Sequence, residues 1–253
     1  MGGILAESVA RKELTNPMIP FLSLLAGGPV LMAGLTFGGG RTLDQVVNLI
    51  LALLIAIDVH ELGHAVVADR LGDDTPRRAG HLSLNPFRHM DQFGILLLFL
   101  TAISSQGFTY GFTPINDRKL RERTPAGPAL VAVAGPLMNL LLAAIVGVYL
   151  AHSFLGGGSA LINGNARLFD FLSTLMSINV FLFVFNLFPL PPLDGWAIVH
   201  SFLTPRKQFE VRRFVQYGPF VLLLLLVFEG NLHFFSSVVY PMTDWVTGRL
   251  LQL

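Results

Sequence analysis

The sequence predicts an all-α protein that crosses a membrane several times, and three observations carry this prediction. Hydrophobic residues make up 53% of the 253 residues. Charged residues make up only 13%, whereas a soluble domain carries about 25%. Several apolar runs reach the roughly 20 residues that a helix needs to cross a bilayer. The net charge of +1 offers no basic field for nucleic acid, and the absence of cysteine excludes disulfides and thiolate metal ligands.

The apolar runs predict a bundle of five to six transmembrane helices. Five runs are long enough to cross: residues 18–37, 45–71, 126–151, 168–190 and 214–239. A sixth run, residues 93–105, is shorter than a span and is more typical of a re-entrant or interfacial element. The fifth run contains Glu229, Gly230 and Asn231, so residues 229–253 are expected to end the last span or to form an interfacial helix.

Positive charges indicate the orientation in the membrane. If residues 93–105 do not cross and the N-terminus is cytoplasmic, every Lys and Arg except Arg41, Arg167 and Arg249 lies on the cytoplasmic side. If that run does cross, the basic residues divide almost evenly between the two sides. The positive-inside rule favours the first layout. We therefore expect a multi-pass protein of the plasma (inner) membrane, with a short re-entrant or β element on its cytoplasmic side.

The second span contains the motif His60-Glu61-Leu62-Gly63-His64. Two histidines four residues apart project from one face of a helix and can bind one zinc ion. The glutamate between them can act as a general base. Since ionisable groups within a membrane are costly, their presence indicates a function. The motif predicts a zinc hydrolase that works within a bilayer, near the cytoplasmic end of a helix that Gly72 is expected to terminate. Asp58, on another face, is expected to meet a polar partner.

A catalytic zinc ion usually has three protein ligands and one open position, so a third ligand is needed. Asp194 is the best candidate, because it follows a span that ends on the cytoplasmic side and therefore lies at the depth of the histidines. The prolines before it break the helix and let the carboxylate turn toward its neighbour. Taken alone, Asp194-Gly195 is also typical of an ordinary turn. The alternative third ligands are Glu122, Glu210 and Glu229.

Three motifs in this order resemble the site-2 proteases, a family of intramembrane zinc metalloproteases. They are HELGH at 60–64, AGPLMN at 134–139 and NLFPLPPLDG at 186–195. The stretch 81–91 also resembles the compact branch of the family. The resemblance covers residues 42–228 and implies a form without a PDZ or CBS domain. It divides the chain into an N-terminal tail and first anchor (1–41), the protease core (42–228) and a C-terminal segment (229–253).

The resemblance implies the roles of the site residues. His60, His64 and Asp194 would bind one zinc ion, and Glu61 would be the catalytic base. The substrate would be a transmembrane protein, cleaved within or beside its membrane segment, and its unwound backbone is expected to pair with a strand edge around residues 81–86. Further polar residues are expected to bind substrate or to order the site: Asn85, His89, Asn139 and Asn186.

Two other functions remain compatible with the residues. The first is a membrane zincin of another type that acts on soluble peptides. The second is a catalytically silent membrane scaffold or a transporter that keeps the motif without hydrolysis.

Overall fold

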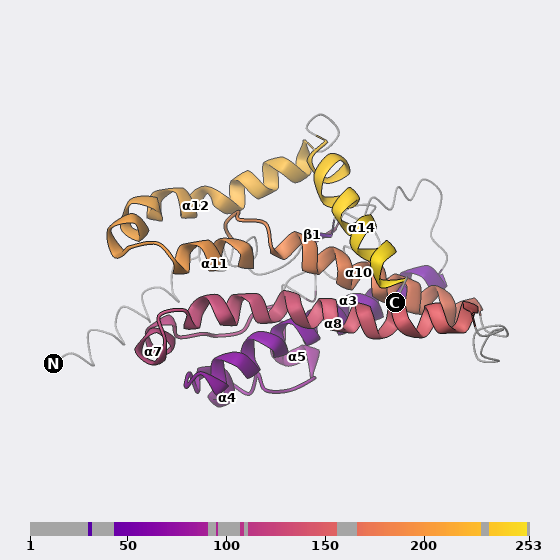
Figure 1. Cartoon of the computed structure of the whole chain (residues 1–253), viewed down its shortest axis with the longest axis horizontal. Helices are drawn as coiled ribbons and strands as arrows, with labels where there is room; N and C mark the ends of the chain where they lie inside the picture. The colour runs from indigo at the N-terminus through magenta and orange to yellow at the C-terminus, as the bar shows by residue number, and fades with distance from the viewer. Residues whose placement is uncertain are drawn as a thin grey trace.

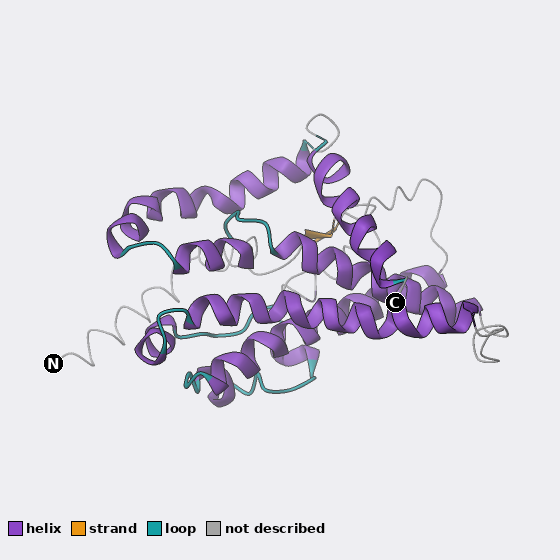
Figure 2. Ribbon diagram, in the orientation of Figure 1, coloured by secondary structure: helices purple, strands orange, loops and turns teal. Residues whose placement is uncertain are grey.

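A computed structural model of the chain describes residues 30–31, 43–90, 95, 107–108, 111–155, 166–228 and 233–251. Helices dominate this part of the chain, as predicted (Figure 2). Two strands of two residues each, β1 (Val30–Leu31) and β2 (Gly107–Phe108), form one antiparallel pair. All but Val30–Leu31 of the predicted first span, and all but Ile95 of the predicted re-entrant run, lie outside the described residues.

Three helices in the described ranges are long and apolar enough to cross a membrane: α3 (Leu43–Arg70), α8 (Gly127–Leu155) and α10 (Ala166–Asn186). They correspond to the second, third and fourth predicted spans. Each of the three packs against the other two, and α8 is the long helix across the middle of Figure 1.

Each of these helices has one buried and one exposed apolar face. On α3, Val47, Leu51 and Ile55 are exposed and lie four residues apart, while Ala52 and Leu53 are fully buried. Residues four apart share one helix face, so the exposed residues form a continuous apolar stripe. Such a stripe is costly in water but suits contact with lipid.

Gly72 terminates α3, as predicted. Its φ of 95° lies in the left-handed region, which glycine adopts without a Cβ penalty. The N–H of Gly72 donates to the carbonyl of Asp69 (3.0 Å), and the N–H of Asp73 donates to the carbonyl of Ala68 (2.9 Å). These two bonds form a Schellman motif, which satisfies carbonyls that the helix end would otherwise leave free.

Short helices follow the end of α3, namely α4 (Thr75–Arg78), α5 (Pro86–His89) and α7 (Asp117–Arg123). Residues 82–84 form bends and no residue from 81 to 86 belongs to a strand, so the prediction of a strand edge around 81–86 is wrong. The reason is local, because the side chain of Asn85 accepts from the N–H of Phe87 (3.1 Å) and Pro86 occupies the first helical position. An N-cap followed by proline starts a helix.

The C-terminal part comprises α11 (Asp194–Ser201), α12 (Pro205–Val227), a π-helical turn η1 (Phe235–Val239) and α14 (Tyr240–Leu250). Helix α12 begins before the predicted run 214–239, at Pro205, and ends within it, at Val227. Its first half is strongly charged, so α12 is not among the three apolar helices above. Helix α14 packs against α10, and Phe235 and Val239 are buried beside it.

Candidate metal centre and active site

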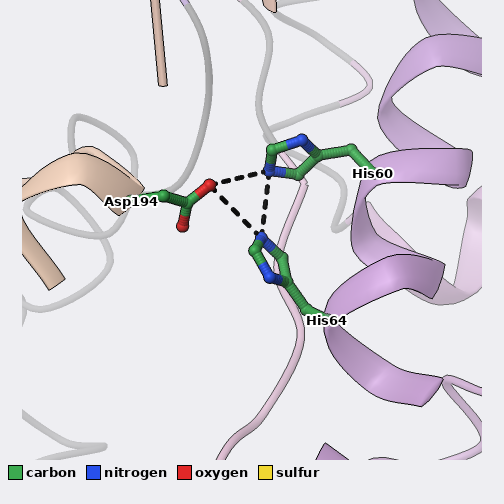
Figure 3. Close-up of side chains that lie close together, drawn as sticks. All are labelled: His60, His64 and Asp194. Atoms are coloured by element: carbon green, nitrogen blue, oxygen red, sulfur yellow. Dashed lines mark hydrogen bonds and ion pairs between the residues drawn. The ribbon is translucent and has the colours of Figure 1, made fainter. Parts of the chain in front are cut away.

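Three ligand-type atoms from two helices converge on one point (Figure 3). The Nε2 atoms of His60 and His64, both on α3, lie 3.0 Å apart. Asp194, the first residue of α11, places its Oδ2 3.1 Å from Nε2 of His60 and 3.4 Å from Nε2 of His64. The structure thus brings together the three residues that the sequence analysis named as metal ligands.

The other nitrogen of each imidazole is held by an oxygen. Nδ1 of His60 lies 2.6 Å from Oδ1 of Asn139, and Nδ1 of His64 lies 2.7 Å from the carbonyl oxygen of Val131. Carbonyl and amide oxygens only accept, so each Nδ1 must carry the hydrogen. The lone pair of each Nε2 then points into the triangle, which is the tautomer that a metal-binding histidine needs.

The triangle fits a bound cation. In the neutral tautomers described above neither Nε2 carries a proton, and the buried Oδ2 of Asp194 has no hydrogen-bond partner. Three electron-rich atoms so close together repel one another unless a positive charge lies among them. Ligands at 2.0–2.1 Å in a tetrahedral zinc site lie about 3.4 Å apart. The observed separations of 3.0 to 3.4 Å fit one face of such a tetrahedron, which leaves a fourth position for water.

Helix α8 forms the wall of the triangle with its backbone. A Cβ atom on Gly135 would lie against the imidazole of His64 and 2.7 Å from Nε2 of His60. Only glycine therefore permits this approach of α8. Gly135 and Asn139 lie four residues apart, so both face the site. The stretch 134–139 thus supplies a bare backbone surface and, one turn later, the amide that orients His60.

Asn139 also joins three helices. Its Nδ2 donates to the carbonyl of Ala56 on α3 (2.9 Å) and to Oδ1 of Asn179 on α10 (2.8 Å). Both asparagines are fully buried. Asn179 was not predicted from the sequence, because it belongs to no recognised motif. Its position as a lone amide within an apolar span could have indicated a role, since such residues often hydrogen-bond between membrane helices.

Glu61 lies at the wall of a cavity of about 210 Å³ that the three ligand-type residues and Asn186 also line. Its side chain is almost enclosed, and its backbone carbonyl accepts from Oγ1 of Thr113 (3.2 Å). A Cβ on Gly111 would lie 2.7 Å from Cγ of Glu61. The stretch 111–113 therefore packs directly against Glu61, a contact that no motif in the sequence indicated.

Two of the predicted site residues lie away from the cavity. Asn85 is exposed and caps α5. His89 is buried, with Nε2 2.9 Å from the carbonyl oxygen of Ser83 and 3.5 Å from Oδ1 of Asp58, so it is the polar neighbour that Asp58 was expected to have. The ring of His81 packs edge-on against His89, and burial lowers the pKa of His81.

Comparison with known proteins identifies the family. A sequence model described as peptidase family M50 matches residues 48–166 and 156–226. YwhC of Bacillus subtilis, a proposed zinc metalloprotease, is 35% identical over 209 residues, which cover 81% of this chain and 90% of that protein.

Two mycobacterial relatives named Rip2, also proposed zinc metalloproteases, are each 29% identical to the chain. The match to Rip2 of Mycobacterium tuberculosis spans 248 residues, 94% of this chain and 91% of the relative. The match to Rip2 of Mycolicibacterium smegmatis spans 195 residues, 76% and 71%. No solved structure matches the chain significantly. The chain belongs to peptidase family M50, the site-2 protease family of metalloendopeptidases that its three motifs resemble.

Proposed function

We propose that this chain is a zinc-dependent endopeptidase that cleaves a membrane protein within or next to a transmembrane segment. The observation that carries the proposal is the cavity shared by Glu61 and the three ligand-type atoms, part-way along a helix long enough to span a membrane. His60 lies ten residues before the end of α3, or about 15 Å at 1.5 Å per residue. That depth falls inside a hydrocarbon core of about 30 Å.

The cavity is proposed to open toward the cytoplasmic side of the plasma membrane, with the N-terminus on the same side. The charge distribution supports this orientation, because α4 and α7 lie at the end of α3 nearer the cavity and both carry arginines in their last turns. Cytoplasmic loops are enriched in such residues. The described residues support three of the five to six proposed spans directly, through α3, α8 and α10.

The residues around the cavity are proposed to have two roles, metal binding and general-base catalysis. His60, His64 and Asp194 would hold zinc through the atoms described above, and the descriptions of the relatives support this choice of metal. Bound zinc would supply Lewis acidity, which activates a water molecule and polarises a peptide carbonyl. Glu61 would accept a proton from the attacking water on its carboxylate and donate it to the leaving amine.

A substrate helix must unwind before its carbonyls can react, and its backbone groups then need new partners. Residues 111–115 can provide them. Gly111 and Thr113 both face α3, whereas the side chain of Phe112 is 53% exposed and its N–H donates to the carbonyl of His89 (2.8 Å). Such alternation is typical of extended backbone. The N–H groups of Thr113 and Ile115 have no partner among the described residues, so this edge of the segment can pair with substrate.

The decisive experiment compares the parent with Glu61→Gln on a membrane-anchored substrate in lipid vesicles. Loss of a general base lowers the rate by about 10²–10⁴-fold. We expect Glu61→Gln to lose activity on that scale and to retain its zinc, because Glu61 is not a ligand. Glu122→Gln is the matched control, since Glu122 lies on the surface of α7 in an ion pair with Arg118. Equal cleavage by the parent and Glu61→Gln would refute the proposal.

Two further comparisons test where the substrate binds. The same cleavage sequence is presented as a soluble peptide and inside a membrane segment, and preference for the soluble form would contradict intramembrane cleavage. Ile115→Pro removes one donor of the proposed edge, whereas Ile115→Ala keeps it. We expect the proline variant to raise KM more than the alanine variant does, and equal KM values would assign substrate pairing to another segment.

A further inference from the structure

A buried carboxylate beyond the end of α3 is linked to the wall of the cavity. Asp73 is 0% exposed although it follows the helix in a polar loop. Its Oδ1 accepts from the N–H (3.1 Å) and the hydroxyl of Thr75, and its Oδ2 accepts from the N–H of Asn116 (2.6 Å). Nζ of Lys119 lies 4.0 Å from Oδ1. A buried carboxylate is tolerated when charge-assisted hydrogen bonds replace its water, as they do here.

Asn116 ends the segment 111–116, whose residues Gly111, Thr113 and Ile115 line the cavity. The beginning of the segment is held by the bond from the N–H of Phe112 to the carbonyl of His89. Its end is held by Asp73. The segment is therefore tied down at Phe112 and Asn116, on either side of Thr113, whose hydroxyl bonds the carbonyl of Glu61. One of the two ties is a side chain 12 residues beyond Glu61 in sequence.

The backbone at Gly111 packs tightly against Glu61. A Cβ on Gly111 would lie 2.6 Å from Cγ2 of Ile57 and 2.9 Å from Oε1 of Glu61. The backbone of the segment therefore limits where the Glu61 carboxylate can lie. Displacement of a reacting group by about 1 Å can cost on the order of 10²-fold in rate. Loosening either end of the segment would permit such a displacement.

We propose that Asp73 is a positioning residue of the peptidase, which fixes segment 111–116 against Glu61 through its hydrogen bond to Asn116. Asp73 touches neither the cavity nor the metal ligands and acts through the segment alone. The proposal rests on the proposed function, because it assigns Asp73 a role in placing the general base.

The neighbouring Asp74 provides a matched control. Its carboxylate forms ion pairs with Arg78 and Lys119 at the surface, and its side chain is 38% exposed. The hydrogen bond from Lys119, with that from Arg78, holds the pKa of Asp74 below its usual range. No hydrogen bond joins Asp74 to segment 111–116 among the described residues. Asp74→Asn therefore removes the same charge one residue away without releasing the segment.

The kinetic test compares Asp73→Asn with Asp74→Asn in the full chain, on the membrane-anchored substrate. We expect Asp73→Asn to lower kcat by roughly 10- to 100-fold, with unchanged zinc content. Asp74→Asn should retain the parent kcat. If Asp73→Asn behaves like Asp74→Asn while Glu61→Gln is inactive, the inference fails and the proposed function stands.

A second measurement does not depend on activity. The chain has no cysteine, so Thr113→Cys introduces a single thiol at a position that is 7% exposed. We expect a thiol reagent to label it roughly tenfold faster in the Asp73→Asn background, as the loss of a hydrogen bond to a charged group predicts. Equal labelling rates would overturn the inference even if the parent cleaves nothing.

A third variant distinguishes the effect of Asp73 on segment 111–116 from its effect on the turn at Thr75. Thr75→Val removes the hydroxyl bond to Asp73 and leaves the bond to Asn116 in place. We expect it to change kcat and labelling much less than Asp73→Asn does. If Thr75→Val reproduces the full effect, Asp73 only stabilises its own turn and the inference is wrong.

Discussion

Replacing Gly135 with alanine would test the geometry of the metal centre with a single added methyl group. In an ordinary exposed helix this change stabilises by about 1 kcal/mol, because alanine has the higher helix propensity. At Gly135 the new Cβ would lie 2.7 Å from Nε2 of His60 and against the ring of His64. Relief of that overlap requires a displacement of about 0.8 Å from His60 and about 1.1 Å from His64, whose Nε2 would lie closer still to the new Cβ, given contact distances of about 3.5 Å.

A displacement of this size exceeds what a metal site tolerates, which is about 0.2 Å in its ligand distances. Either α8 moves away from α3, or the two rings rotate and weaken their bonds to Asn139 and the carbonyl of Val131. Loss of such orienting bonds alone lowers metal affinity about 10- to 100-fold. Overpacking adds a destabilisation of about 1–3 kcal/mol. We expect Gly135→Ala to weaken zinc binding at least 100-fold and to lower the thermal stability.

The assay is a zinc competition titration with a chromophoric chelator, followed by thermal unfolding of the metal-free protein. Gly147→Ala on the same helix is the matched control. Its Cβ would lie 3.2 Å from Sδ of Met176, 3.4 Å from Cβ of Leu250 and 3.6 Å from the carbonyl oxygen of Leu250, so zinc affinity should not change. If Gly135→Ala binds zinc as tightly as Gly147→Ala does, α8 does not form the wall of the metal site and the geometric reasoning is refuted.

Three further predictions concern the support of the site and the end of α3. Asn139→Leu removes the acceptor of the His60 Nδ1 hydrogen, so zinc affinity in the same titration should fall about 10- to 100-fold. Asp194→Ala removes one of three ligands, so the protein should retain less than one zinc ion per chain after dialysis, as measured by metal analysis. Gly72→Ala forces a left-handed φ on a residue with a Cβ, so the free energy of unfolding should fall by about 1 kcal/mol with zinc affinity unchanged.

Each of these predictions has a contradicting outcome. Parent-like zinc affinity in Asn139→Leu would mean that another group orients His60. A full zinc content in Asp194→Ala would return the third-ligand role to one of the glutamates considered above. A Gly72→Ala variant as stable as the parent would mean that α3 ends without needing the left-handed turn.

The sequence predicted which three ligand-type residues come together, because their signal lies in side-chain chemistry and spacing. Two histidines four apart must share a helix face, and Asp194 could be placed at their depth from the order of spans alone. Gly135 and the carbonyl of Val131 were not predictable in this way. Gly135 matters because it has no side chain, and Val131 because of its backbone oxygen. Neither contribution can be assigned from the residue type until the packing of α8 is known.

The errors in the fold prediction also have physical causes. The strand expected around residues 81–86 conflicts with Asn85-Pro86, an N-cap and first-turn pair that starts a helix. The predicted run 214–239 took its start from hydrophobicity, whereas Glu229, Gly230 and Asn231 already indicated an interruption near its end. Helix α12 instead begins at Pro205, within a charged stretch, and ends at Val227. Apolar content indicates where a chain can meet lipid, but caps and turn residues decide where a helix begins and ends.

The amide of Asn139 has a consequence for how the protein assembles in its bilayer. Sliding α8 past its neighbours by a single turn, about 5.4 Å, would separate that amide from Nδ1 of His60 and from Oδ1 of Asn179. Lipid cannot solvate it, so each misaligned arrangement carries a penalty that water would largely remove. The hydrogen bonds of Asn139 therefore favour one depth of α8 relative to α3, whether or not a metal ion is bound. The same alignment orients the imidazole of His60 for metal binding.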